Sequence, residues 1–134
     1  MATDAAAGAA GGTLAAIDHV QVAIPPGGEG PARAFYGGLL GLREVEKPAN
    51  LRGRGGVWFQ TASLQLHLGV EADFRPATKA HVAFRVTDLD DVRHRLAAAG
   101  HRVREDEPLP GHRRFYVDDP FGNRTEVLQP MGAG

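Results

Sequence analysis

Two strand-like runs with the same pattern constrain the fold of this chain more than any other feature. The first spans residues 16–24 and carries His19, and the second spans 79–86 and carries His81, 62 positions later. Each run is followed by a helical segment, expected at 31–40 and 88–99, and then by three further strands. This repeat predicts an α+β fold of two βαβββ modules that form a curved mixed sheet with the helices on its outer face.

Turn signals and composition set the expected boundaries. The further strands are expected near 42–47, 56–60 and 64–68 in the first half, and near 101–105, 112–118 and 124–128 in the second. The modules would therefore span 15–70 and 77–130 within a single domain at 15–130. Residues 1–14 are rich in Ala and Gly and have neither the basic start nor the long apolar core of a signal peptide, so they are predicted to be a disordered tail.

Charge and cysteine content exclude several kinds of function. The formal net charge is −1, and the 15 basic residues form no long cluster, so nucleic acid is not an expected partner. No run approaches the ~18–20 apolar residues of a membrane-spanning helix, and a cytoplasmic protein is expected. The chain has no cysteine, which leaves imidazoles and carboxylates as its strong metal-binding side chains.

The alternation along the predicted strands separates two kinds of side chain. If the aliphatic residues point toward the helices, the opposite face is polar and aromatic. It carries His19, Gln21, Trp58, Gln60, Gln65, His67, His81, Arg85, Arg114, Tyr116, Glu126 and Leu128. A merely solvated face would more often carry Lys, Glu, Ser and Thr, so this set favours a binding or catalytic site.

Two imidazoles and one carboxylate on this face predict a divalent-metal site. His19 and His81 occupy equivalent strands of the repeat, and Glu126 lies in the last strand. Such a ligand set suits Zn, Ni, Fe, Mn or Co and leaves open positions where a substrate can bind. The alternative is two half-buried strand histidines and a surface glutamate. The remaining histidines, His94, His101 and His112, are expected to be solvated.

Four segments of the chain form a recognisable set: Ile17–Val20, Phe35–Leu42, Ala80–Phe84 and Phe115–Asn123, the last leading to Glu126. They resemble the vicinal oxygen chelate superfamily, which includes glyoxalase I, fosfomycin-resistance thiol transferases, extradiol dioxygenases and bleomycin-resistance proteins. The resemblance implies paired βαβββ modules and His19, His81 and Glu126 as metal ligands. A further ligand is usual in the last strand of the first module, where this chain offers His67, with Gln65 two residues earlier.

The resemblance also implies an activity and roles for individual residues. The leading hypothesis is a glyoxalase I-like lyase or isomerase that acts on a small carbonyl compound or thiol adduct through a metal-bound enediolate-type intermediate. Glu126 would be ligand and base, and His67 would be fourth ligand or proton carrier. Substrate-positioning residues would be Trp58, Arg114 and Tyr116. The alternatives are an Fe(II)-dependent extradiol-type dioxygenase and a non-catalytic binding protein. A homodimer is expected, and the sequence leaves open whether the metal site lies within one chain or is shared by two.

Overall fold

The structure is a computed structural model that describes residues 12–132, and it contains the two predicted modules. The first consists of β1 (His19–Ile24), α2 (Glu29–Ala32), η1 (Arg33–Leu39), β2 (Arg43–Val45), η2 (Ala49–Arg54), β3 (Val57–Gln60) and β4 (Gln65–Val70). The second consists of β5 (Val82–Arg85), α3 (Leu89–Ala98), β6 (Val103–Arg104), β7 (His112–Asp118) and β8 (Arg124–Pro130). Most of the predicted tail at 1–14 lies outside the described residues, and the division at 15–70 and 77–130 stays a prediction.

Each module contains one four-stranded mixed sheet with the same strand order. The orders are β1-β4-β3-β2 and β5-β8-β7-β6, so the strands that correspond in the repeat occupy the same places. In each sheet the first strand pairs in parallel with the last, and the other neighbours pair antiparallel. The α+β class is therefore confirmed, with two sheets in place of one continuous sheet. The strands β1 and β5, which begin the first and the second module, both lie at the edges of their sheets.

The first helical segment differs from the expected helix at 31–40. It begins earlier, as the short α2, and continues as η1, a wider helical turn in which the Leu40 N–H donates to the Phe35 carbonyl over 3.0 Å. Two glycines, Gly37 and Gly38, lie in this turn, and glycine weakens a regular helix. The turn nevertheless buries Phe35 and Tyr36 against the sheet.

The second helix follows the sequence signals closely. The Asp88 carboxylate accepts a hydrogen bond from the Asp91 N–H over 3.1 Å and so caps α3. Leu89, Val92 and Leu96 form its buried stripe, and Gly100 takes a positive φ of 90° next to the C-cap residue Ala99. His101 was expected to be solvated, but it is half-buried, and its ring contacts Phe35 edge-on with 5.1 Å between the ring centroids.

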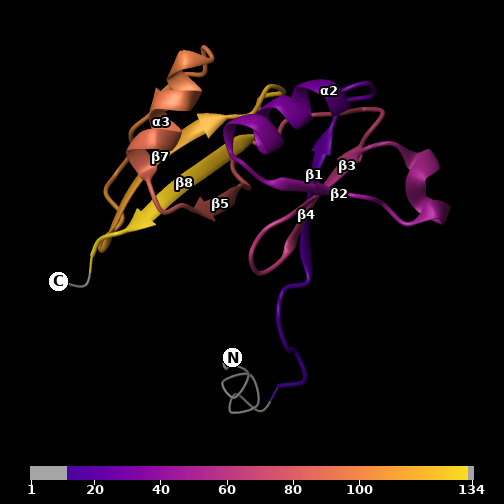
Figure 1. Cartoon of the computed structure of the whole chain (residues 1–134), viewed down its shortest axis with the longest axis horizontal. Helices are drawn as coiled ribbons and strands as arrows, with labels where there is room; N and C mark the ends of the chain where they lie inside the picture. The colour runs from indigo at the N-terminus through magenta and orange to yellow at the C-terminus, as the bar shows by residue number, and fades with distance from the viewer. Residues whose placement is uncertain (1–11, 133–134) are drawn as a thin grey trace.

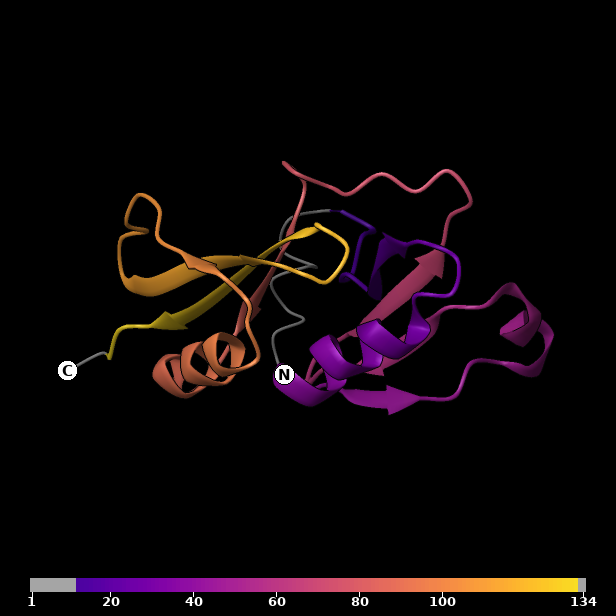
Figure 2. The ribbon, with the colours of Figure 1, turned by 90° about the horizontal axis from the view of Figure 1, so that it is seen from above.

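The two modules lie side by side, the first in indigo to magenta and the second in orange to yellow (Figure 1). Their helices adjoin, with α3 in contact with η1 (Figure 2). A buried polar link joins them below the helices: the Tyr36 hydroxyl donates to Asp119 over 2.7 Å, and the Asn123 amide donates to Asp119 and to the Ala23 carbonyl of β1, each over 2.9 Å. The turn between β7 and β8 therefore fixes the second module to the first.

No helix within residues 12–132 has the length and apolarity that crossing a membrane requires.

Candidate metal and substrate site

The polar face of the first module carries a stack of three rings. The register places Trp58 on β3 opposite His67 on β4, and these rings are parallel, with 3.7 Å between centroids and 2° between planes. His19, on β1, stacks at 4.2 Å from His67. The His67 imidazole therefore lies between an indole and a second imidazole, on the face that strand alternation predicts.

The hydrogen bonds of these two imidazoles differ. His19 Nδ1 lies 2.9 Å from the Asp18 carboxylate, whereas His67 Nε2 lies 2.8 Å from the Gln65 side-chain oxygen. An Nδ1–H held by a carboxylate leaves Nε2 as an acceptor, which is the usual arrangement of a metal-binding histidine. Burial, followed by the neighbouring His19 imidazole, lowers the pKa of His67 below its usual value. The His19 Nε2 is thus free of this hydrogen bond, and the lowered pKa of His67 favours its neutral ring.

The polar face of the second module brings His81 to Glu126. His81 lies one residue before β5, and its Nε2 is 2.9 Å from Glu126 Oε1. His81 Nδ1 is 3.0 Å from the Lys79 carbonyl oxygen. Glu126 is 5% exposed, so its negative charge needs compensation within the protein.

Arg114 and Tyr116 supply part of that compensation. Arg114 Nη1 donates to Glu126 Oε2 over 3.2 Å and to the Tyr116 hydroxyl over 2.9 Å. The Arg114 Nε also donates to the Glu107 carbonyl over 3.1 Å. Arg113, its neighbour in sequence, points the other way and pairs with Asp90, as the alternation of β7 requires. Arg114 therefore holds one oxygen of Glu126 and leaves the other to His81.

The four predicted ligands form two pairs, one on each module. Within residues 12–132 there is no group of three or more His, Asp or Glu side chains close enough to hold one ion. His19 and His67 line a cavity of about 430 Å³ on the first module. His81 borders a different cavity of about 210 Å³ between the modules. One protomer therefore presents two half-sites, and the full ligand set stays a prediction.

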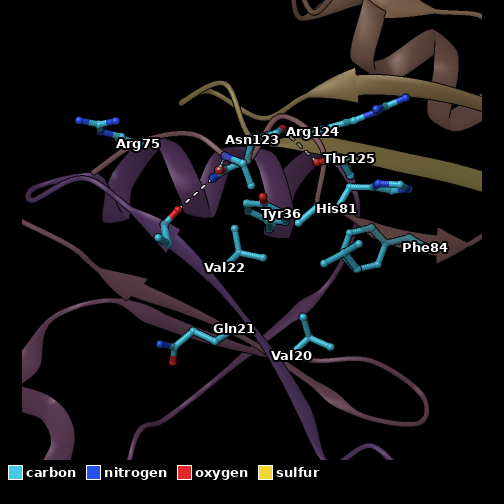
Figure 3. Close-up of a pocket in the computed structure, with 14 residues that line it drawn as sticks. Val20, Gln21, Val22, Tyr36, Arg75, His81, Phe84, Asn123, Arg124 and Thr125 are labelled. Carbon is cyan, nitrogen blue, oxygen red and sulfur yellow. Dashed lines mark hydrogen bonds between the residues drawn. The ribbon is translucent and has the colours of Figure 1, made fainter. Parts of the chain in front are cut away.

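The cavity between the modules is mainly apolar. Figure 3 shows Val20 and Val22 of β1 facing Phe84 of β5, while Gln21 points away from them. These valines and Phe84 are partly exposed although they belong to the aliphatic face. The edge strands β1 and β5 thus leave apolar surface uncovered in one protomer.

Several contributing residues were not among the predicted site residues. Arg124 lies over the Tyr116 ring, with its guanidinium carbon 4.0 Å from the ring centroid, on the same face as Glu126. Strand alternation could have identified it, since it lies two residues before Glu126. Asp18 adjoins His19 in sequence, but its hydrogen bond depends on a rotamer. Lys47 and Arg54 reach the first cavity from η2 and the segment before it, where no strand pattern applies.

Comparisons with known proteins agree with this architecture. A family model described as a glyoxalase-like domain matches residues 21–128. A protein from Bacillus anthracis assigned to the glyoxalase family is 46% identical, with a TM-score of 0.85, over 90% of this chain and 98% of that chain. No curated protein matches the chain.

Two more distant solved structures share the fold. The fosfomycin resistance protein FosX from Listeria monocytogenes, in complex with Mn(II) and sulfate, is 16% identical with a TM-score of 0.71, over 89% of this chain and 93% of that chain. A glyoxalase/dioxygenase from Nostoc punctiforme is 23% identical with a TM-score of 0.72, over 90% and 94%. The paired modules, the family match over most of the chain and the 46% identical structure together make this chain a member of the glyoxalase-like family within the vicinal oxygen chelate superfamily.

Proposed function

We propose that this protein is a divalent-metal-dependent, glyoxalase I-like lyase or isomerase that acts on a small carbonyl compound or thiol adduct. The observation that carries the proposal is the pairing of His81 with the buried Glu126. A carbonyl oxygen only accepts hydrogen bonds, so the contact with Lys79 requires that His81 Nδ1 carries a proton. In the neutral ring, Nε2 then faces the Glu126 carboxylate as a second acceptor, so either a proton on Nε2 or a cation between the two atoms must join them.

A divalent ion fits that requirement. Two donor atoms that bind one ion at about 2 Å and at right angles to each other lie about 3 Å apart. The separation of 2.9 Å between His81 Nε2 and Glu126 Oε1 agrees with this value. His19, whose Nδ1 is held by Asp18, has the same ligand-like orientation. We therefore assign His19, His81 and Glu126 as ligands, in keeping with the manganese complex of FosX.

We further propose that a homodimer completes the site. His19 lies on one half-site and the His81–Glu126 pair on the other, so His19 of one copy would join the pair of the second copy. Support comes from the open edges of β1 and β5 and from the uncovered apolar side chains of Val20, Val22 and Phe84. Burying these side chains at an interface is favourable, and isologous contacts are the usual form of a dimer.

The ion would supply Lewis-acid stabilisation of negative charge that develops on a substrate oxygen. The residues of the chain would do the rest. Glu126 serves as ligand and as base, with Arg114 holding its other oxygen in place. His67, held neutral between Trp58 and His19, is assigned as a proton carrier and not as a fourth ligand, because its Nε2 already bonds to the Gln65 side chain. Trp58 and Tyr116 would form the walls against which the substrate lies.

The test is metal-dependent turnover. Protein loaded separately with Ni, Zn or Fe should convert hemithioacetals of one or more thiols. The His81→Ala variant should lose metal affinity by at least about 100-fold, measured by calorimetry, together with turnover. The His94→Ala variant, which alters an exposed histidine of α3, is the matched control and should behave as the wild type.

Other outcomes would redirect the assignment. Oxygen uptake with catechols in the presence of Fe(II), absent with Zn, would indicate the dioxygenase chemistry instead. Tight binding of a small molecule that survives both EDTA and loss of His81 would indicate a binding protein. Equal metal affinity in the wild type and the His81→Ala variant would contradict the ligand assignment itself.

A further inference from the structure

The cavity of the first module extends from the ring stack to a positively charged segment. One wall is formed by Trp58, His67 and His19, and the other by Lys47, Leu51 and Arg54. Its volume of about 430 Å³ is sufficient for a small organic molecule. An aromatic surface and a charged segment therefore face the same space.

The fixed charges of this cavity have one sign. Among its lining residues Lys47 and Arg54 are cationic, and no carboxylate is present. Glu29 lies behind the glycine pair at 55–56, where its carboxylate accepts the Gly56 N–H over 2.8 Å. The Lys47 Nζ donates to the Gly55 carbonyl, which holds the ammonium group itself at the cavity rim with two N–H donors left, and its charge is among the causes that lower the pKa of Glu29.

Arg52 provides a contrast within the same segment. It lies on η2 like Arg54, but it donates to Glu46 over 3.3 Å and to the Lys47 carbonyl over 3.0 Å, and it does not line the cavity. For Arg54, by contrast, the described residues provide no carboxylate within ion-pair distance. The two arginines thus differ in position and pairing but not in chemical type.

We infer that Lys47 and Arg54 form an anion-binding subsite and that the substrate of this site is a small organic anion with a planar or aromatic portion. A carboxylate or phosphonate would pair with the two cations, since guanidinium and ammonium groups bind such oxygens through charge-assisted hydrogen bonds. The planar portion would lie along Trp58 toward the imidazoles. This inference rests on the proposed function in one respect, because it identifies the cavity as the place of the substrate.

The chain provides its own reporter for a test. Trp58 is the single tryptophan, so its fluorescence reports on this cavity alone. Metal-free protein in EDTA would be titrated with phenylphosphonate and, separately, with dimethyl phenylphosphonate, which has the same ring without the charge. Phenylphosphonate should change the fluorescence with saturation, and added salt should weaken its binding. The neutral ester should bind about tenfold more weakly or not at all.

Three substitutions make the test specific. Arg54→Gln and Lys47→Met should each weaken phenylphosphonate binding by about five- to tenfold. Arg52→Gln, the matched control, should leave it unchanged. Circular dichroism checks that each variant is folded, and Arg54 is exposed, so its substitution should not disturb the fold. Equal affinity of the wild type and the Arg54→Gln variant, or equal binding of the charged and neutral ligands, would overturn the inference.

The binding test and the turnover test can fail separately. Phenylphosphonate binding is measured without metal, so a positive result stands even if no hemithioacetal is converted. Conversely, turnover that depends on His81 but is indifferent to Arg54 and Lys47 would uphold the proposed function and remove this subsite.

Discussion

Single polar residues hold the two modules together, and Asn123 is the clearest case. It is 2% exposed, and it bonds to Asp119, to the Ala23 carbonyl and to the Ala77 N–H, which belongs to the segment between the modules. If the amide were removed, the Ala23 carbonyl and the Ala77 N–H would each lose this partner in a partly buried position, while Asp119 would keep the Tyr36 hydroxyl. An unpaired buried polar group costs much more than the net contribution of the bond that it made.

Asn123→Ala should therefore lower the free energy of unfolding by about 3 kcal/mol, measured by urea denaturation. Asn50→Ala, at an exposed position of η2, serves as the control and should change it by less than about 0.5 kcal/mol. A loss below about 1 kcal/mol for Asn123→Ala would mean that water or a rearranged turn replaces the amide.

For single residues, the sequence predicted which way a side chain points better than it predicted which residue that side chain contacts. Alternation correctly separated Arg114 from Arg113, and the Asp88 cap follows from its position before an apolar stripe. The link from Tyr36 to Asp119 spans 83 positions and depends on how the two modules pack. Burial, together with the Asp119 charge, raises the pKa of the Tyr36 hydroxyl above its usual range, so it remains a donor. Local patterns carry no information about such a contact.

Among the elements, the start of β3 is tied to α2 through a charge. Gly56 has a positive φ of 88°, and a Cβ there would lie 2.2 Å from the Leu68 carbonyl oxygen, so only glycine fits. Its N–H donates to the Glu29 carboxylate over 2.8 Å. That backbone hydrogen bond is the main cause that lowers the pKa of Glu29 below 4.5. Folding therefore stabilises the ionised form of Glu29 relative to its protonated form.

This tie predicts a pH dependence with a definite sign. Because the pKa is lower in the folded state, the stabilisation by Glu29 is complete above its unfolded value near 4.5 and is lost as the pH falls through the folded value. Glu29→Gln should therefore be less stable than the wild type at neutral pH, and the difference should shrink below pH 4.5. Urea denaturation of both proteins over this range is the measurement. A difference that stays constant with pH would contradict the role of the charge.

Element types were more predictable than element boundaries. The strands and α3 follow from hydrophobic periodicity because burial on one face selects that periodicity. The helical segment expected at 31–40 contains η1, but its wider turn was not predicted, and neither was the η2 helix. Both contain glycine; η1 buries Phe35 and Tyr36, so packing contributes to its form, whereas η2 buries no residue. The strand order within each sheet was not predicted, but the repeat agrees with its being the same in both modules.

At the scale of the whole molecule, the candidate site is divided. The sequence predicted the polar face and its residues, since parity within each strand is a local property. It could not predict whether the two half-sites meet, because that depends on how modules pair within or between chains. In one protomer they are separate, as described above.

A dimer that shares ligands makes a prediction that a single-chain site does not. His19→Ala and His81→Ala should each be metal-free as purified homodimers. When the two variants are unfolded together and refolded, about half of the dimers should be mixed, and each mixed dimer regains one intact site of two. Metal analysis should then find about a quarter of the wild-type content. A mixture that remains metal-free would place all the ligands within one chain.

The two sheets have the same strand order, yet their polar faces are chemically unlike. One offers an indole and imidazoles, and the other a guanidinium, a phenol and a carboxylate. A pocket built from both would have walls that match in backbone arrangement but not in side chains. A flat substrate with similar ends would then bind in a single orientation. A proton donated by the protein would therefore add to only one face of the substrate. The product of such a reaction should be a single enantiomer.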